Sequence, residues 1–147
     1  MMTDVQTSTR MLSILCQLFS SRMAALLEPH GLTPAQFGIL NHIARPDLRE
    51  GTRVSDIAKA VEVRQPAVTK TIAKFEEAGL VRLTPSAHDA RAKLINITPE
   101  GGAHLIEVQK SIGPNLAGLF ADIPAEDLAQ FNRTAGKLIG WLDTNRL

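Results

Sequence analysis

The sequence has no tyrosine, one tryptophan and five phenylalanines, so aromatic residues make up only 4% of its 147 residues. Aromatic side chains favour strands, and a core with few of them suits packed helices better than a sheet sandwich. Hydrophobic residues make up 44% and charged residues 21% of the chain, as in ordinary globular proteins. The composition therefore predicts a mainly helical fold, and the length is that of one domain, residues 1–147.

Cysteine is nearly absent as well, because Cys16 is the only one. A single cysteine cannot form an intramolecular disulfide, so we expect a cytoplasmic protein. Residues 11–19 are largely apolar and faintly resemble a signal peptide, but Asp4 precedes them and the apolar spacing continues to Leu27 as in a helix. No run approaches the ~20 apolar residues that span a bilayer, so we expect no membrane partner.

Motifs of common enzyme classes are also missing. The sequence has no Gly-x-Ser-x-Gly elbow, no Gly-rich phosphate loop and no His-Glu-x-x-His run. We therefore expect neither an enzyme nor a cofactor. The four histidines form no pair at helical spacing and have no cysteine partner, which argues against a metal site.

Apolar residues recur at helical spacing near both ends of the chain. Residues 7–30 predict one long amphipathic helix, and residues 99–145 predict two, which begin at Pro99 and Pro124. The last two carry many large apolar side chains, which either need a partner surface or cap the monomer's own core. They are Ile106, Ile112, Leu116, Leu119, Phe120, Phe131, Leu138 and Trp141.

Residues 33–98 predict three shorter helices followed by two strands. Thr33 is a helix cap, Ser55 caps the next helix, and a turn at residues 62–64 leads into a third helix that stops at Gly79. Residues 80–84 and 93–98 then alternate apolar and polar side chains as strands do. This order, with a charged loop between the strands, is that of a winged helix-turn-helix, and the fold class is mainly α with a small β wing.

Positive charge is concentrated in the same region. Residues 52–98 hold eight Lys or Arg against five acidic residues, whereas the remainder has a net charge of −2. On the second helix of the pair, Gln65 can bond base edges, Thr69 can offer a methyl or a hydroxyl, and lysines can neutralise phosphates. The proposed DNA-binding residues are Ser55, Arg64, Gln65, Pro66, Ala67, Thr69, Lys70, Lys74, Asp89, Arg91 and Lys93.

The loop between the strands is the predicted wing. It places Arg91 near a hairpin tip, where an arginine can enter a narrow minor groove, and Asp89 is expected to pair with its guanidinium. Two plainer interpretations stay open. A helix pair of this kind is common in all-helical folds, and a plain exposed hairpin would also carry charges.

Six short stretches, in this order, resemble the MarR family of bacterial regulators, those related to the multiple-antibiotic-resistance repressor. They are residues 32–37 (LTPAQF), 54–58 (VSDIA), 68–70 (VTK), 77–81 (EAGLV), 89–93 (DARAK) and 97–101 (ITPEG). The resemblance implies a homodimer whose helices at 7–30 and 99–145 intertwine, with residues 33–98 of each chain placed over a pseudo-palindromic operator. It also implies a regulator, most simply a repressor, whose DNA affinity falls when a small aromatic or phenolic effector binds.

Three positions depart from the family pattern. Glu62 stands where a glycine or small polar residue is common, Arg64 replaces a Ser or Asp cap, and Ala90 lies beside Arg91 where the wing tip is usually arginine-rich. The Arg64 departure weakens helix capping but adds a charge that can bind phosphate.

The resemblance suggests two ways in which the protein could sense a signal. An effector pocket would be lined by Leu12, Phe19, Met23, Phe37 and His42, which could equally be plain core residues. One branch of the family senses organic peroxides through a cysteine in the first helix, which Cys16 resembles. That branch surrounds the thiol with tyrosines, however, and this chain has none, so a buried inert thiol is the competing interpretation. A winged helix that binds protein rather than DNA is a further alternative, which weak dependence on salt would reveal.

Overall fold

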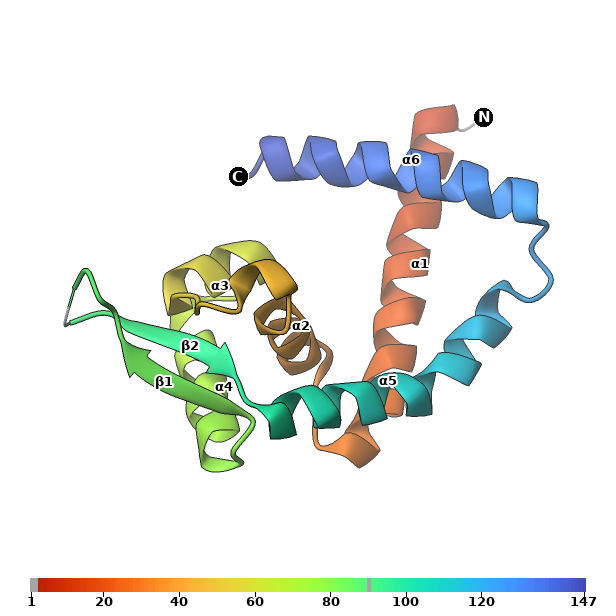
Figure 1. Ribbon diagram of the computed structural model, residues 1–147. Helices are drawn as coiled ribbons and strands as arrows, with labels where there is room; N and C mark the ends of the chain where they lie inside the picture. The colour runs from red at the N-terminus through yellow and green to blue at the C-terminus, as the bar shows by residue number, and fades with distance from the viewer. Residues whose placement is uncertain (1–2, 90) are drawn as a thin grey trace. The chain divides into compact units, whose positions relative to one another are not determined.

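The computed structural model describes residues 3–89 and 91–147, and it is mainly helical with one two-stranded sheet (Figure 1). This confirms the predicted fold class. The chain divides into two compact units, Met1–Lys110 and Ser111–Leu147, which are taken in turn below. The assignment of residues 1–147 to a single domain stays a prediction.

Helix α1, Asp4–Leu27, begins three residues earlier than expected because Thr3 caps it. The Gln6 N–H donates to Thr3 Oγ1 at 3.2 Å and the Thr3 N–H donates to Gln6 Oε1 at 2.8 Å, which completes a capping box. A short 3-10 helix, η1 (Glu28–His30), follows, and Gly31 then turns the chain with a left-handed φ of 70°.

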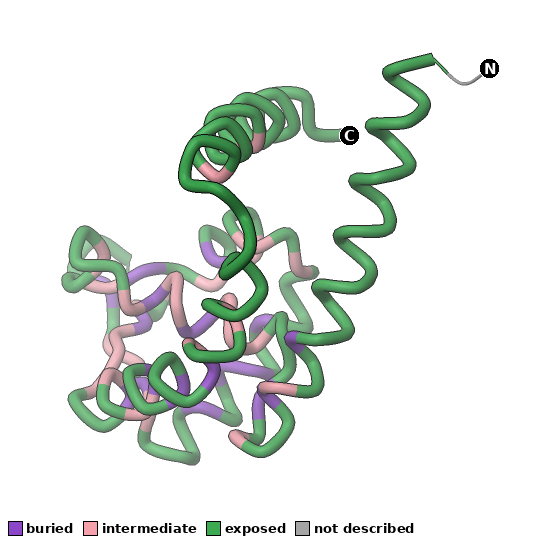
Figure 2. Tube along the Cα trace, turned by 90° about the vertical axis from the view of Figure 1, so that its right-hand side faces the viewer, coloured by how far each residue is buried: buried purple, intermediate pink, exposed green. Residues whose placement is uncertain are grey.

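Most of α1 is exposed (Figure 2), and only Met23 and Leu27 are buried. The segment Asp4–His30 is long and apolar enough, by length and composition alone, to cross a membrane. Our expectation that no segment approaches that length was therefore wrong. Serine, threonine and glutamine interrupt the apolar pattern of α1 without adding charge, which is what a bilayer opposes most. The charged residues of α1 are Asp4, Arg10 and Arg22, and only the two arginines lie beyond its first turn. The mostly buried core helix of a soluble protein and a signal sequence near the N-terminus pass the same test.

Helices α2 (Pro34–Ile43), α3 (Val54–Val61) and α4 (Gln65–Glu77) enclose the main core of the first unit, and a short 3-10 helix, η2 (Pro46–Leu48), follows α2. As predicted, Thr33 caps α2. Their buried apolar side chains are Ile39, Leu40, Ile43, Ile57, Val68, Ile72 and Phe75.

The start of α3 differs from the prediction. Arg53 is the N-cap, with extended backbone and no capping bond from its side chain, so Ser55 lies inside the first turn and does not cap the helix. At the other end Glu62 adopts a left-handed conformation, with φ 56°, which explains why glycine suits this position. The Val63 N–H donates to the Ala58 carbonyl at 3.1 Å and closes the turn into α4.

Strands β1 (Val81–Pro85) and β2 (Lys93–Ile97) pair antiparallel, with Leu83 opposite Ile95. An isolated antiparallel β-bridge between Thr52 and Ile95 adds to this hairpin, and the sequence did not predict it. The Thr52 N–H donates to the Ile95 carbonyl at 3.1 Å, and the Ile95 N–H donates back at 2.8 Å. The base of the wing is thereby tied to the segment that precedes α3.

Helix α5, Pro99–Phe120, begins at the foot of the wing and buries Leu105, Val108 and Ile112. Ile112 belongs to the side chains expected either to need a partner surface or to cap the monomer's own core. It is only 3% exposed within this chain, which supports the second interpretation for this residue. Three- and four-residue spacing from Leu105 places it on the buried stripe of the helix.

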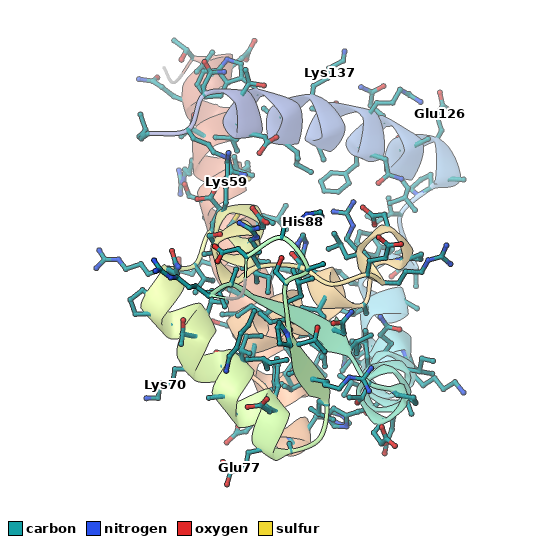
Figure 3. All side chains as sticks on the ribbon, turned by 60° about the vertical axis from the view of Figure 1, so that its left-hand side comes forward. Lys59, Lys70, Glu77, His88, Glu126 and Lys137 are labelled. Carbon is teal, nitrogen blue, oxygen red and sulfur yellow. The ribbon has the colours of Figure 1, made fainter. Side chains whose placement is uncertain are left out.

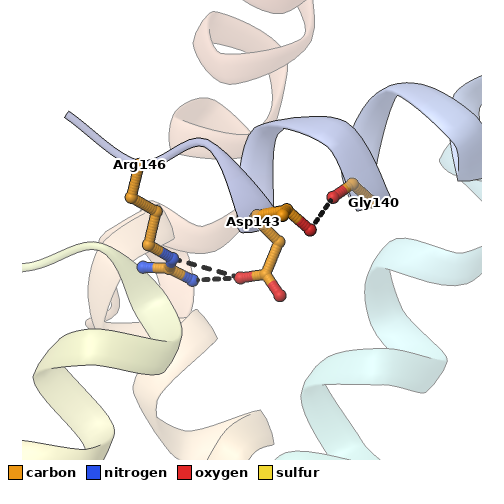
Figure 4. A network of polar contacts seen from close by, with 4 residues as sticks. Gly140, Asp143 and Arg146 are labelled. Atoms are coloured by element: carbon orange, nitrogen blue, oxygen red, sulfur yellow. Dashed lines mark hydrogen bonds and ion pairs between the residues drawn. The ribbon is translucent and has the colours of Figure 1, made fainter.

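The second unit contains the end of α5 and helix α6, Ala125–Thr144, in which no residue is buried. Near its end the Arg146 guanidinium pairs with Asp143, and the Thr144 hydroxyl donates to the Gly140 carbonyl at 2.9 Å (Figure 4). Large apolar side chains of α5 and α6 lie exposed: Ile106, Leu119, Phe120, Phe131, Leu138, Ile139, Trp141 and Leu142.

Candidate nucleic-acid interface

Helix α4 has one buried and one exposed face. Val68, Ile72 and Phe75 pack into the core with exposed fractions of 0 to 2%, and this fixes which side of the helix faces outward. The predicted DNA-reading residues Arg64, Gln65, Pro66, Ala67, Thr69 and Lys70 are all exposed. Figure 3 shows Lys70 pointing away from the rest of the winged unit. The geometry thus brings six of the predicted residues onto one accessible surface.

The N-terminus of α4 offers positive potential to an anion. Arg64 is its N-cap and makes no capping bond, as the departure from the family pattern predicted, and Pro66 lies in the first turn. The positive end of the helix dipole attracts phosphate there, and the exposed Arg64 guanidinium adds a full charge. The arrangement suits contact with a phosphodiester backbone at the entrance of a groove.

Thr69 has less freedom than the sequence suggests. Its hydroxyl donates to the Gln65 carbonyl at 3.1 Å, within the helix. The hydroxyl proton is thereby used, while the methyl group and an oxygen lone pair stay available. Thr69 is therefore suited to contact a thymine methyl or to accept a bond from a base amino group.

Lys74 lies differently from the expectation. Its ammonium donates to the Gly31 carbonyl at 2.7 Å and to Gln36 Oε1 at 3.2 Å. Both acceptors belong to the turn that starts α2, so the geometry directs this charge to the protein's own backbone and away from a phosphate. Helical spacing alone places Lys74 with Lys70 and could not reveal this contact.

The described residues of the wing loop are 86–89, 91 and 92. The Ser86 N–H donates to the Ala92 carbonyl at 2.9 Å, and Asp89 Oδ1 accepts the backbone N–H of Arg91 at 2.9 Å. The predicted pairing of Asp89 with the Arg91 guanidinium was therefore wrong, since the carboxylate shapes the turn instead. Arg91 and Lys93 are exposed, and Ala90 lies outside the described residues.

Arg53 was counted as a basic residue of this region but was given no role. It is exposed at the N-cap of α3, two residues from the exposed Ser55. Asn96 of β2 donates to the Arg49 carbonyl at 3.0 Å and holds the loop before α3 against the wing. Its position next to a helix start was the signal in the sequence that could have marked Arg53 as a candidate for this interface.

The proposed effector residues do not line one enclosed site within a single chain. Leu12 and Phe19 are 42% and 40% exposed, whereas Met23 is buried. Leu12 and Met23 are separated by about 16 Å along the axis of α1, at 1.5 Å per residue. Phe37 and His42 of α2 are half-buried. Burial lowers the pKa of His42 below its ordinary value, and the nearby positive charge of Arg45 lowers it further, against the opposing effects of Asp47 and Asp56.

Cys16 is exposed on α1, so the interpretation of this residue as buried was wrong. Its side chain lies on the part of α1 that has no buried residue. Whether the thiol has a redox role stays a prediction. Within residues 3–89 and 91–147, no group of three or more His, Cys, Asp or Glu side chains is placed to hold a metal ion.

Comparison with known proteins gives a consistent result. The model of the MarR family matches residues 30–92. Two curated relatives are the transcriptional repressor MdtR of Bacillus subtilis, 28% identical over 99% of this chain and 90% of its own length, and the transcriptional activatory protein BadR of Rhodopseudomonas palustris. BadR is 33% identical over 56% of this chain, and the match spans 46% of BadR, about half its length.

A solved structure supports the fold independently. It is that of a MarR mutant from E. coli complexed with operator DNA, with a TM-score of 0.75, 22% identity, and coverage of 92% of this chain and 95% of the other. At that identity the likeness concerns the fold alone. The two relatives bear the names of transcriptional regulators.

Proposed function

The chain belongs to the MarR family, and on that premise we propose that it is a repressor that binds a pseudo-palindromic DNA operator as a homodimer. A single observation supports this most strongly. The buried stripe of α4 turns Arg64, Gln65, Thr69 and Lys70 outward together, beside a wing that ends in an exposed Arg91. That is the arrangement in which a recognition helix enters the major groove and a wing arginine enters the minor groove.

The exposed apolar side chains support the homodimer. On α1, Met11, Leu12, Ile14, Leu15, Leu18 and Phe19 are all at least 40% exposed, and α5 and α6 add the residues named above. Six large apolar side chains exposed within nine residues of one helix are unusual for a monomeric soluble protein, whereas obligate homodimer interfaces are built from such surface. Two winged units in one dimer would read two half-sites about one helical turn of DNA apart.

The proposal also covers the direction of regulation, repression rather than activation, and the class of effector. The match to a repressor runs along almost the whole chain, whereas the match to an activator covers just over half of it, which favours repression. A small aromatic or phenolic effector would bind where Leu12 and Phe19 of α1 become covered by the second protomer. We place the protein in the cytoplasm, where its DNA partner lies.

Regulation through Cys16 is a second candidate, favoured by the exposure of its thiol. Treatment of purified protein with an organic hydroperoxide, followed by DNA titration, tests it. Loss of affinity in the wild type but not in Cys16→Ser would support a redox sensor. Equal behaviour of the two proteins would overturn it.

The main proposal is tested by selection of genomic fragments with purified protein at near-physiological salt, followed by titration of the best fragment and measurement of the mass in solution. We expect an enriched palindrome, bound by a dimer, with affinity that falls steeply as salt rises. A monomer with no fragment preference would overturn it. Salt-insensitive capture of protein rather than DNA would favour an interaction module.

A further inference from the structure

Lys74 is the lysine of α4 that turns back toward its own chain. It lies near the end of the helix, yet its ammonium is 2.7 Å from the Gly31 carbonyl and 3.2 Å from Gln36 Oε1, which are 43 and 38 residues away in sequence. Lys70, one turn earlier, is exposed and has no such bond in the described part of the chain. The two lysines of α4 therefore have different tasks.

Both acceptors of the Lys74 bonds are fixed by local structure. Gly31 ends η1 in a left-handed conformation, and its carbonyl accepts no backbone bond among the described residues. Gln36 Oε1 already accepts the Thr33 N–H at 3.1 Å in the capping box of α2. The Lys74 ammonium thus donates to two oxygen atoms that the turn at Gly31 and the capping box of α2 hold in place.

The Lys74 hydrogen bonds give α4 a directional contact, which the apolar contacts of its buried face do not provide. Val68, Ile72 and Phe75 hold the helix by apolar contact, which is strong but not directional. Hydrogen bonds to two fixed oxygens restrict rotation and sliding of the helix. Gln65 lies nine residues before Lys74, about 13 Å along the axis, so a small rotation at Lys74 displaces the groove-facing end.

From this geometry we infer that Lys74 is a positioning residue for DNA recognition, which anchors α4 to the start of α2 and does not contact phosphate. The inference rests on the proposed DNA-binding function. Base readout tolerates displacements of only about 0.5 Å, so loss of the anchor weakens operator binding without removing a charge from the interface.

The test compares Lys74→Met with the matched control Lys70→Met by titration of the selected operator at a series of salt concentrations, well below the unfolding temperature. For Lys74→Met we expect roughly three- to tenfold weaker binding and an unchanged slope of log affinity against log salt. For Lys70→Met we expect weaker binding and a slope reduced by about one. A Lys74→Met slope reduced by about one, or an unchanged affinity, would overturn the inference.

Two further variants separate positioning from general stability. Lys74→Arg keeps cationic donors and is expected to restore most of the affinity. Gln36→Met removes one acceptor of the Lys74 ammonium and also the side-chain half of the α2 capping box. The double variant is expected to lose less affinity than the sum of the two single losses, because part of each loss acts through the shared contact. Additive losses, or no rescue by arginine, would count against the anchor.

The operator titration also shows whether the proposed DNA-binding function itself fails. A wild-type protein that binds no duplex overturns the proposed function, and the DNA role of Lys74 with it. The anchor is then judged by a double-variant cycle of Gln36→Met and Lys74→Met on urea unfolding. Coupling between the two positions supports the contact, and strict additivity overturns it.

Discussion

The Thr98 hydroxyl donates to the Gly79 carbonyl at 2.6 Å, and the same oxygen accepts the Gly101 N–H at 3.0 Å. One side chain thereby caps α5 and ties it to the turn that ends α4. The Thr98 N–H adds a bond to the Leu80 carbonyl at 3.0 Å. The recognition helix, the wing and the first turn of α5 meet at this junction.

Thr98→Val is therefore expected to destabilise the fold by about 1 to 3 kcal/mol, because it removes a helix cap and leaves the Gly79 carbonyl without its donor. Urea unfolding measures the effect. Thr9→Val is the control, since the Thr9 hydroxyl only donates back to Val5 on the exposed face of α1. Equal stability of the two variants would contradict the role of the junction.

Gly101→Ala is expected to cost roughly 3 kcal/mol or more, because an added Cβ would lie 2.0 Å from the Leu80 carbonyl oxygen, which is backbone and cannot move aside cheaply. Gly102→Ala is a matched control in the same helical turn, with nothing within 4 Å. It should be neutral or stabilising by about 0.5 to 1 kcal/mol. Thermal unfolding of both variants decides the point, and similar midpoints would refute it.

Arg91→Ala is expected to weaken operator binding by about 1 to 3 kcal/mol, with no change in solution mass or helix content. Titration by fluorescence anisotropy measures it. Arg146→Ala is the control, because that arginine pairs with Asp143 at the end of α6, outside the proposed interface. Unchanged binding by Arg91→Ala would show that the wing does not enter a groove.

Leu18→Glu is expected to convert the proposed dimer to monomers and to abolish operator binding, because Leu18 is 66% exposed on the apolar face of α1 and a buried carboxylate would be unpaired there. Sedimentation measures the mass. Helix content should be retained, since the side chain contributes nothing to the monomer core. A stable Leu18→Glu dimer would exclude this face of α1 from the interface.

The pH dependence of stability should carry a contribution from His42. Because its pKa is lowered in the folded protein, the unfolded chain binds the proton more readily. The contribution is complete above the ordinary pKa of about 6.5 and is lost as the pH falls through and below that value. Urea unfolding at pH 7.5 and pH 5.5 should show a smaller loss in His42→Asn than in the wild type. An identical loss would contradict the shift.

The sequence by itself determined the order of elements and the direction of most side chains. Caps such as Thr33, the stop at Gly79 and the buried spacing of Val68, Ile72 and Phe75 are local signals, because they depend on residues within one or two turns. From them the helix pair, the wing and the outward face of α4 could be predicted.

The tertiary structure decided which polar groups meet across long sequence separations. The Lys74 anchor, the pairing of Thr52 with Ile95 and the close approach of Gly101 to the Leu80 carbonyl join segments whose spacing carries no shared period. From the sequence, a guanidinium and a backbone N–H were both possible partners of the Asp89 carboxylate, and the structure shows the bond to the Arg91 N–H. Periodicity reports which face of an element is apolar, whereas a hydrogen bond between distant elements depends on how their axes are placed by packing.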